Sequence, residues 1–135
     1  MIKIIFVRLN IIYIDNIRNN KNMKTASILK ELNFNETKPA ISVMMETDFT
    51  KEIRILFRKD QLMKEHKAPL PIVVEIVDGE IDFGVNGESF HLKKGELISL
   101  EANMPHNLTA LSESIVRLTL SKGDHASRVK EVTTS

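Results

Sequence analysis

Two of the four histidines in this chain, His66 and His106, are the residues best suited to chemistry. The chain contains no cysteine, which excludes disulfides, thiolate ligands and a cysteine nucleophile and leaves histidine, aspartate and glutamate as the strong metal ligands. A neutral imidazole binds divalent metals, and near neutral pH it also exchanges protons. The two histidines therefore predict either a ligand pair or two imidazoles held by ordinary hydrogen bonds.

Other candidate residues carry weaker signals. His91 lies on the polar side of a short predicted strand, where a solvated histidine is expected, and His125 lies in a polar tail. Arg54, Arg58 and Arg117 alternate with apolar residues and suit either a pocket for an anion or, more commonly, a solvated or interface face. Four methionines offer an adaptable lining for an apolar ligand or fill gaps in the core: Met44, Met45, Met63 and Met104. No hydrolase or kinase motif occurs.

Short β-strands must position these residues. Apolar and polar residues alternate along 52–58, 81–86 and 115–121, the period of two expected when one strand face is buried. The apolar run 72–77 predicts a strand covered on both faces. Asp78-Gly79 and Asn86-Gly87 predict hairpin turns because both dipeptides accept positive φ angles, and Lys93-Lys94-Gly95 predicts a third turn. The pattern predicts a meander of antiparallel strands in a sandwich or small barrel.

The two ends of the chain differ from this pattern. Residues 1–22 hold four basic residues against Asp15 alone and are interpreted as an N-terminal extension, with a signal peptide or an extra edge strand as alternatives. Residues 23–40 form a lead-in in which Thr25 to Leu32 predicts a short helix. Residues 122–135 are polar and predict a flexible tail.

The stretch around the two histidines resembles the motifs of the cupin family. The first cupin motif places a glycine, a His-x-His pair, a glutamate and a second glycine at fixed intervals, and His66 and Gly79 fit it. The second motif holds a glycine, a Pro-x-Gly turn, a histidine and an asparagine, and Gly95 and His106 fit it. The remaining motif positions carry other residues: Asp60, Ala68, Ile72, Glu101, Asn103 and Ala110.

The resemblance implies an all-β fold, a cupin-type double-stranded β-helix or jelly-roll-like barrel over residues 41–121. In a metal-binding cupin the His-x-His pair, the glutamate and the later histidine hold the ion, so the resemblance carries a ligand role for zinc, iron, manganese or nickel only onto His66 and His106. Ala68 and Ile72 provide no lone pair. Asp60 and Asn103 stand where the motifs have glycines. Aspartate and asparagine are the residue types that tolerate a left-handed backbone best after glycine.

These observations favour a barrel that binds a small molecule, with a divalent metal held weakly. The alternatives are a metal-dependent enzyme of the dioxygenase or isomerase kind, whose third ligand would be sought first at Glu101, and a structural or sensory domain. Whether the protein is an enzyme stays open at this point.

Charge and hydropathy limit the partners. The chain has 19 basic and 18 acidic residues, so it lacks the positive field that nucleic acids require. Arg8 and Asn10 interrupt the most apolar run, which argues against a membrane span. A cytoplasmic location is compatible with the lack of cysteine. A homodimer is expected because an uncovered edge strand needs a partner.

Overall fold

The computed structural model describes residues 23–123, which form nine β-strands and no α-helix. The strands are β1 (Ala40–Glu46), β2 (Thr50–Phe57), β3 (Leu62–His66), β4 (Ile72–Asp78), β5 (Glu80–Val85), β6 (Glu88–Lys93), β7 (Leu97–Leu100), β8 (His106–Ala110) and β9 (Ser114–Ser121). No helix in these residues is long and apolar enough to cross a membrane. The predictions for the extension 1–22, for His125 and for the tail beyond residue 123 fall outside the described residues.

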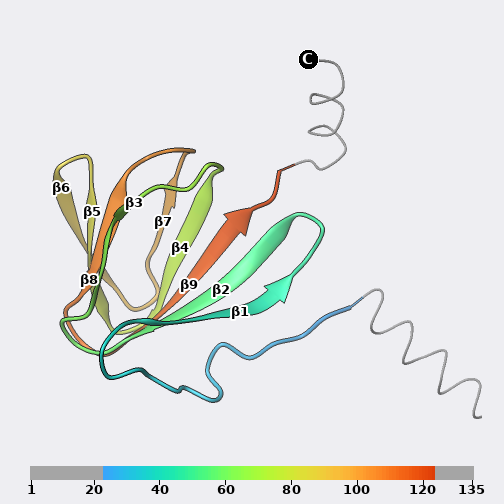
Figure 1. Ribbon diagram of the computed structural model, residues 1–135, viewed down its shortest axis with the longest axis horizontal. Coiled ribbons are helices and arrows are strands. Elements are labelled where there is room, and N and C mark those ends of the chain that lie inside the picture. Colours follow the sequence, from blue (N-terminus) through green and yellow to red (C-terminus); the bar gives the residue numbers. More distant parts are fainter. Residues whose placement is uncertain (1–22, 124–135) are drawn as a thin grey trace, which may run out of the picture.

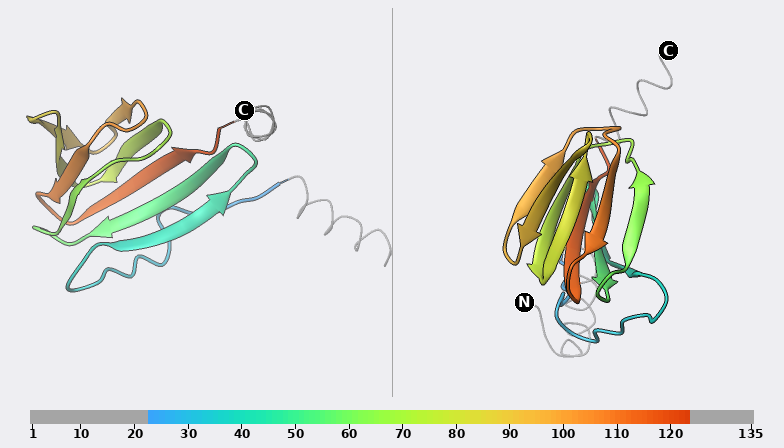
Figure 2. Two further views of the ribbon diagram at one scale, coloured as in Figure 1. Left: turned by 45° about the horizontal axis from the view of Figure 1, so that its top comes forward. Right: turned by 90° about the vertical axis from the view of Figure 1, so that its left-hand side faces the viewer.

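The strands form two antiparallel sheets that enclose one core (Figure 1). One sheet has the order β1-β2-β9-β4-β7 and the other the order β3-β8-β5-β6. Figure 2 shows the two sheets as layers facing each other. The predicted all-β, jelly-roll-like barrel is therefore confirmed. The sequence pattern did not predict β3, because most of its residues are polar or exposed.

The predicted meander is wrong, because most turns carry the chain from one sheet to the other. Asn86-Gly87 joins neighbouring strands β5 and β6, as predicted. Asp78-Gly79 instead connects β4 in the five-stranded sheet to β5 in the four-stranded sheet, and the turn ending at Gly95 leads back. A strand pattern gives the period of burial, but it does not say whether the next strand pairs with its predecessor or crosses to the opposite layer.

Four of the crossings between sheets use a left-handed backbone residue. The φ angles are +75° at Asp60, +88° at Gly79, +89° at Gly95 and +65° at Asn103. Asp60 and Asn103 therefore adopt the conformation expected of residues that replace cupin glycines.

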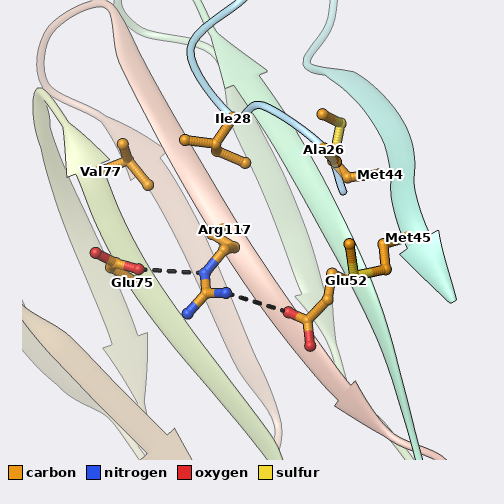
Figure 3. Close-up of a pocket in the computed structure, with 8 residues that line it drawn as sticks. All are labelled: Ala26, Ile28, Met44, Met45, Glu52, Glu75, Val77 and Arg117. Carbon is orange, nitrogen blue, oxygen red and sulfur yellow. Dashed lines mark hydrogen bonds and ion pairs between the residues drawn. The ribbon is translucent and has the colours of Figure 1, made fainter. Parts of the chain in front are cut away.

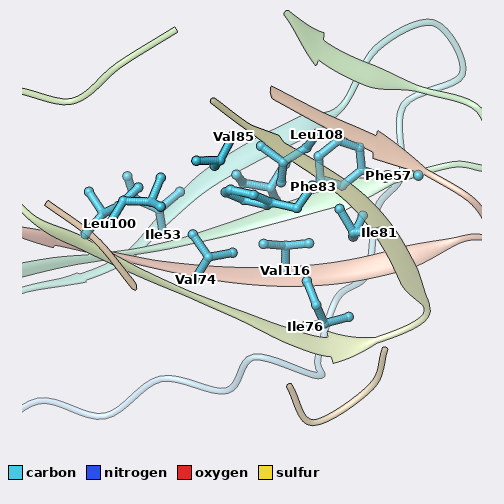
Figure 4. Packing of buried hydrophobic residues seen from close by; sticks show 13 residues of the cluster. Ile53, Phe57, Val74, Ile76, Ile81, Phe83, Val85, Leu100, Leu108 and Val116 are labelled. Atoms are coloured by element: carbon cyan, nitrogen blue, oxygen red, sulfur yellow. The ribbon is translucent and has the colours of Figure 1, made fainter. Parts of the chain in front are cut away.

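The core lies between the sheets and is filled by aliphatic and aromatic side chains (Figure 4). The alternation along 52–58 predicted one buried strand face, and Ile53, Ile55 and Phe57 are buried on it. Leu56 on the other face is only 1% exposed, so this part of β2 is covered on both faces. Phe83 is fully buried on β5. The prediction that 72–77 is covered on both faces is wrong. Ile72, Val74 and Ile76 are buried toward the core, while Val73 on the outer face is 37% exposed.

The predicted helix at Thr25 to Leu32 is also wrong, and the segment instead forms a turn at residues 28–31 within an extended strap, defined here as residues 23–32. Arg54 of β2 explains the difference. Its guanidinium donates to the carbonyls of Ile28 (3.2 Å), Lys30 (2.7 Å) and Glu31 (3.1 Å). Because these acceptors point at the sheet, they are satisfied without helical hydrogen bonds, and so short a helix would be marginal in isolation.

The corner at Gly79 generates a stability prediction with a matched control. A Cβ at Gly79 would lie 2.5 Å from the Glu113 carbonyl oxygen and 2.7 Å from Ser114 Cα, whereas a Cβ at Gly95 would meet nothing within 4 Å at nearly the same φ. Gly95→Ala should cost about 1–2 kcal/mol, the penalty of a left-handed alanine. Gly79→Ala should cost about 1–3 kcal/mol more because of the steric overlap.

Urea denaturation followed by circular dichroism measures the difference between the two variants. Equal losses of stability would contradict the close approach of the β4–β5 corner to the β8–β9 corner.

Candidate functional site

The structure brings the two predicted site residues together. His66 ends β3 and His106 begins β8, and the two residues are opposite each other in the antiparallel pairing of these strands. His106 also lies opposite Val85 of β5, whose side chain is in the core. Since directly opposed residues share one face of a sheet, both histidines are on the core-facing side, at the end of the barrel.

The two imidazole rings are in direct contact. Their centroids are 4.3 Å apart with an interplanar angle of 62°, an edge-to-face arrangement. The His106 ring is stacked parallel to Phe83 at a centroid distance of 5.6 Å. His106 is only 4% exposed, whereas His66 is exposed to solvent. The pair therefore joins the apolar interior to the surface at one end of the barrel.

Both imidazoles are oriented by the same kind of backbone contact. Nδ1 of His66 is 2.6 Å from the carbonyl oxygen of Lys64, and Nδ1 of His106 is 2.8 Å from the carbonyl oxygen of Met104. A neutral imidazole in this position donates its Nδ1 proton to the carbonyl, which leaves Nε2 as an acceptor or ligand atom. Within residues 23–123 neither Nε2 atom makes a hydrogen bond.

The pKa of His106 lies below its ordinary value. Burial is the main cause, because the apolar surroundings disfavour the charged imidazolium, and repulsion from His66 acts in the same direction. The hydrogen bond to the Met104 carbonyl opposes these effects. His106 is thus held as a neutral imidazole, the form that accepts a proton or a metal.

The donor set fits two imidazole ligands and no more. Ile72 is buried in the core, Ala68 is packed against it, and neither has a donor atom. Glu101 is exposed in the loop before β8. Within the part of the chain that the structure describes, no three His, Asp or Glu side chains are grouped to hold a metal. A catalytic zinc site normally has three protein ligands, one more than these two imidazoles supply.

The remaining candidates occupy different places. His91 is exposed and its Nε2 is 2.7 Å from Glu80 Oε1, in agreement with a solvated histidine. Arg58 forms ion pairs with Glu36 and Glu113 at 3.0 and 2.9 Å. The interpretation of Arg54 as solvated, or as part of an anion pocket, is wrong. It is 6% exposed and its charge is directed to the strap carbonyls.

Two pockets lie on the outer faces of the sheets, and neither is lined by His66 or His106. The first, called the outer pocket, has a volume of about 320 Å³ and lies between the strap and the five-stranded sheet (Figure 3). Its apolar lining consists of Ala26, Ile28, Met44, Met45 and Val77, and its charged lining consists of Glu52, Glu75 and Arg117. The second, of about 490 Å³, lies over β5 and includes Asp82, Asn86 and Asn107.

Sequence reasoning identified Arg117 and the methionines Met44 and Met45 as possible pocket residues, but it missed Glu52 and Glu75. Their position in the strand pattern was the one signal that could have indicated Glu52 and Glu75. Each is a carboxylate on the outward face of a predicted strand, and Glu75 interrupts an otherwise apolar run. That signal does not reveal that β9 places Arg117 between them, because the strand order is a property of the fold.

Comparison with known proteins agrees with the fold and the motif spacing. The family model described as Cupin domain matches residues 61–121. Together with the two-sheet architecture, this match shows that the chain is a cupin-domain protein. No curated protein matches the sequence.

Solved structures resemble most of this chain. An RmlC-like cupin from Desulfovibrio desulfuricans is 18% identical with a TM-score of 0.69, over 74% of this chain and 97% of that one. KdgF from Halomonas is 16% identical with a TM-score of 0.65, over 78% and 99%. A cupin 2 conserved barrel domain protein from Leptotrichia buccalis is 32% identical with a TM-score of 0.61, over 67% of this chain and 44% of its own. The first two similarities establish the fold alone.

The lowered pKa of His106 generates a pH prediction. In the unfolded chain this histidine regains an ordinary pKa of about 6.5, so below that pH the unfolded state binds the proton first. The free energy of unfolding should therefore fall as the pH drops through about 6.5, until His106 is protonated in the folded state as well. His106→Asn should remove this contribution, and His91→Asn should not.

Two measurements test the predicted pH dependence: nuclear magnetic resonance titration of the imidazole signals, and urea denaturation at several pH values. A His106 signal that titrates above about 6.5 would contradict the effect of burial.

Proposed function

We propose that this protein binds a small molecule at the end of the barrel where His66 and His106 meet. The observation that carries the proposal is the pair of opposed imidazoles, each fixed through Nδ1 to a backbone carbonyl and each with Nε2 free of partners among the described residues. Two oriented acceptors beside an apolar interior are the combination that small-molecule sites use for orientation and affinity.

The surroundings of the pair define what the ligand should contain. Met63, Ala68 and Met104 are partly buried against the core, and Met63 and Met104 supply flexible, polarisable surface. A ligand with an apolar body would pack against these side chains. A hydroxyl or N–H group on it would donate to Nε2 of His106, whose neutral form is favoured by burial.

The proposal also includes a divalent metal ion, which would be zinc, iron, manganese or nickel. His66 and His106 would hold the ion through Nε2, and when bound it would supply a Lewis acid to a ligand oxygen. Two imidazoles without a third protein ligand hold such an ion weakly.

The donor set favours a binding function over the alternative of a metal-dependent dioxygenase-like or isomerase-like enzyme. That enzyme would need a third ligand, and residues 23–123 do not group one with the two histidines. A structural or sensory role would follow if neither metal nor small molecules bound. The cytoplasm, which suits a chain without cysteine, is part of the same proposal.

Metal titration tests the histidine pair. Calorimetry with Zn²⁺ and Ni²⁺ should show weak, reversible binding that weakens below about pH 6.5, because protonated imidazole does not coordinate. His66→Ala and His106→Ala should each abolish this binding. His91→Ala is the matched control, since His91 is exposed and paired with Glu80, and it should bind as the wild type does.

Two results would contradict the binding proposal. One is a single metal ion per chain that survives dialysis against chelator, because it would require a third ligand and would support the enzyme. The other is metal binding that is unchanged in both His66→Ala and His106→Ala.

We further propose that the chain forms a homodimer through β1. This strand is the edge of the five-stranded sheet (Figure 1). Ile41 and Val43 are each 58% exposed although they lie opposite the core residues Ile55 and Ile53. An exposed edge with apolar side chains is an unfavourable surface for a monomer, and a second copy would cover both the edge and the side chains.

A charge on β1 tests the dimer. Val43→Lys should convert the dimer to a monomer, because burying an unpaired ammonium in an apolar interface costs several kcal/mol. Val73→Lys is the control, since Val73 is partly exposed on the outer face of a central strand. Light scattering measures the mass. A wild-type mass of 15.4 kDa at micromolar concentration would contradict the proposal.

A further inference from the structure

The outer pocket lies on the opposite side of the five-stranded sheet from the histidine pair and is built by side chains that the proposed function does not use. Its floor is formed by outward-facing residues of β2, β4 and β9, and the strap residues Ala26 and Ile28 form one wall (Figure 3). A volume of about 320 Å³ is at the lower end of the range of small-molecule sites.

The charges of the floor do not balance. Arg117 Nε donates to Glu75 Oε1 at 3.2 Å, and Arg117 Nη1 is 3.6 Å from Glu52 Oε1. One guanidinium therefore serves two carboxylates, which leaves one negative charge. Arg117 was one of the arginines considered for an anion pocket. Its positive charge is already compensated by Glu52 and Glu75, so the net negative charge of the floor disfavours an anion.

The carboxylates also keep free acceptor atoms. Oε1 of Glu52 accepts a hydrogen bond from Thr119 Oγ1 at 2.6 Å, but Oε2 of Glu52 and Oε2 of Glu75 accept none within the described residues. Glu52 is only 18% exposed at its side chain, so water screens its charge less than it would at the surface.

A second arginine on the same sheet, Arg54, does not neutralise this floor from within the pocket. Arg54 lies opposite Arg117 on the neighbouring strand, but it is buried under the strap and its guanidinium faces the carbonyls of Ile28, Lys30 and Glu31. It does not line the pocket. Its hydrogen bonds hold the strap wall in place, which makes Arg54 a positioning residue for the pocket.

We infer that the outer pocket binds an organic amine in its cationic form. The ammonium group would donate to the free oxygens of Glu52 and Glu75, and an aliphatic or aromatic body would pack against Ile28, Met44 and Val77. An ammonium has three donors and no acceptor, which complements two acceptor-only carboxylates. The methionine side chains adapt to the shape of the apolar body.

Three probes of equal size test the sign of the charge: hexylammonium, hexanol and hexanoate. Chemical-shift titration of the full chain should show saturable binding of hexylammonium at residues of the outer pocket, weaker binding of hexanol and no binding of hexanoate. Glu52→Gln and Glu75→Gln should each weaken hexylammonium binding by about tenfold, the loss expected for a hydrogen bond between charged groups.

Two further variants distinguish a charge effect from a structural one. Arg117→Gln removes the competing cation, so hexylammonium should bind more tightly than to the wild type. Glu88→Gln changes an exposed glutamate on β6 and should leave the affinity unchanged. His106→Ala should also bind hexylammonium normally, which separates this pocket from the proposed function.

Hexanoate binding as tight as that of hexylammonium would overturn the inference. Wild-type affinity for hexylammonium in both Glu52→Gln and Glu75→Gln would also overturn it. So would weaker hexylammonium binding in a folded Arg117→Gln variant than in the wild type.

Discussion

At four of the connections between the two sheets of this barrel, one residue adopts a left-handed backbone conformation. Asp60, Gly79, Gly95 and Asn103 all have positive φ angles, and each lies between a strand of one sheet and a strand of the other. At Gly79 the chain also passes so close to Ser114 that no side chain fits. These corners direct both layers onto the same apolar core, and they place the ends of β3 and β8 side by side.

The histidine pair is a consequence of that geometry. Because the corner at Asn103 leads into β8, His106 enters the sheet on the core-facing side and stacks on Phe83. The cupin framework is kept in its backbone while its ligand set is reduced, since Ile72 is part of the core. Replacing a buried carboxylate by an aliphatic side chain removes a desolvation cost. Ile72 therefore adds to the apolar core at a position where a carboxylate would be costly to bury.

Arg54 links the strap to the sheet and creates the second candidate site. Its guanidinium satisfies three carbonyls that would otherwise face a sheet surface. The strap then covers part of the outer face and forms a wall over Glu52, Glu75 and Arg117. A single buried charge thus organises a region that has no regular secondary structure of its own.

The sequence by itself determined several of the strands, the core-facing side of those strands and the position of the two histidines in the cupin motifs, because alternation and left-handed turn residues are local properties. It also predicted that Asp60 and Asn103 serve as glycines do. Only the tertiary structure decided that Asp78-Gly79 is a crossing between sheets, that Arg54 is buried, and that Arg117 lies between two glutamates. These features depend on which strands become neighbours, and that choice is made by the packing of the whole core rather than by any one segment.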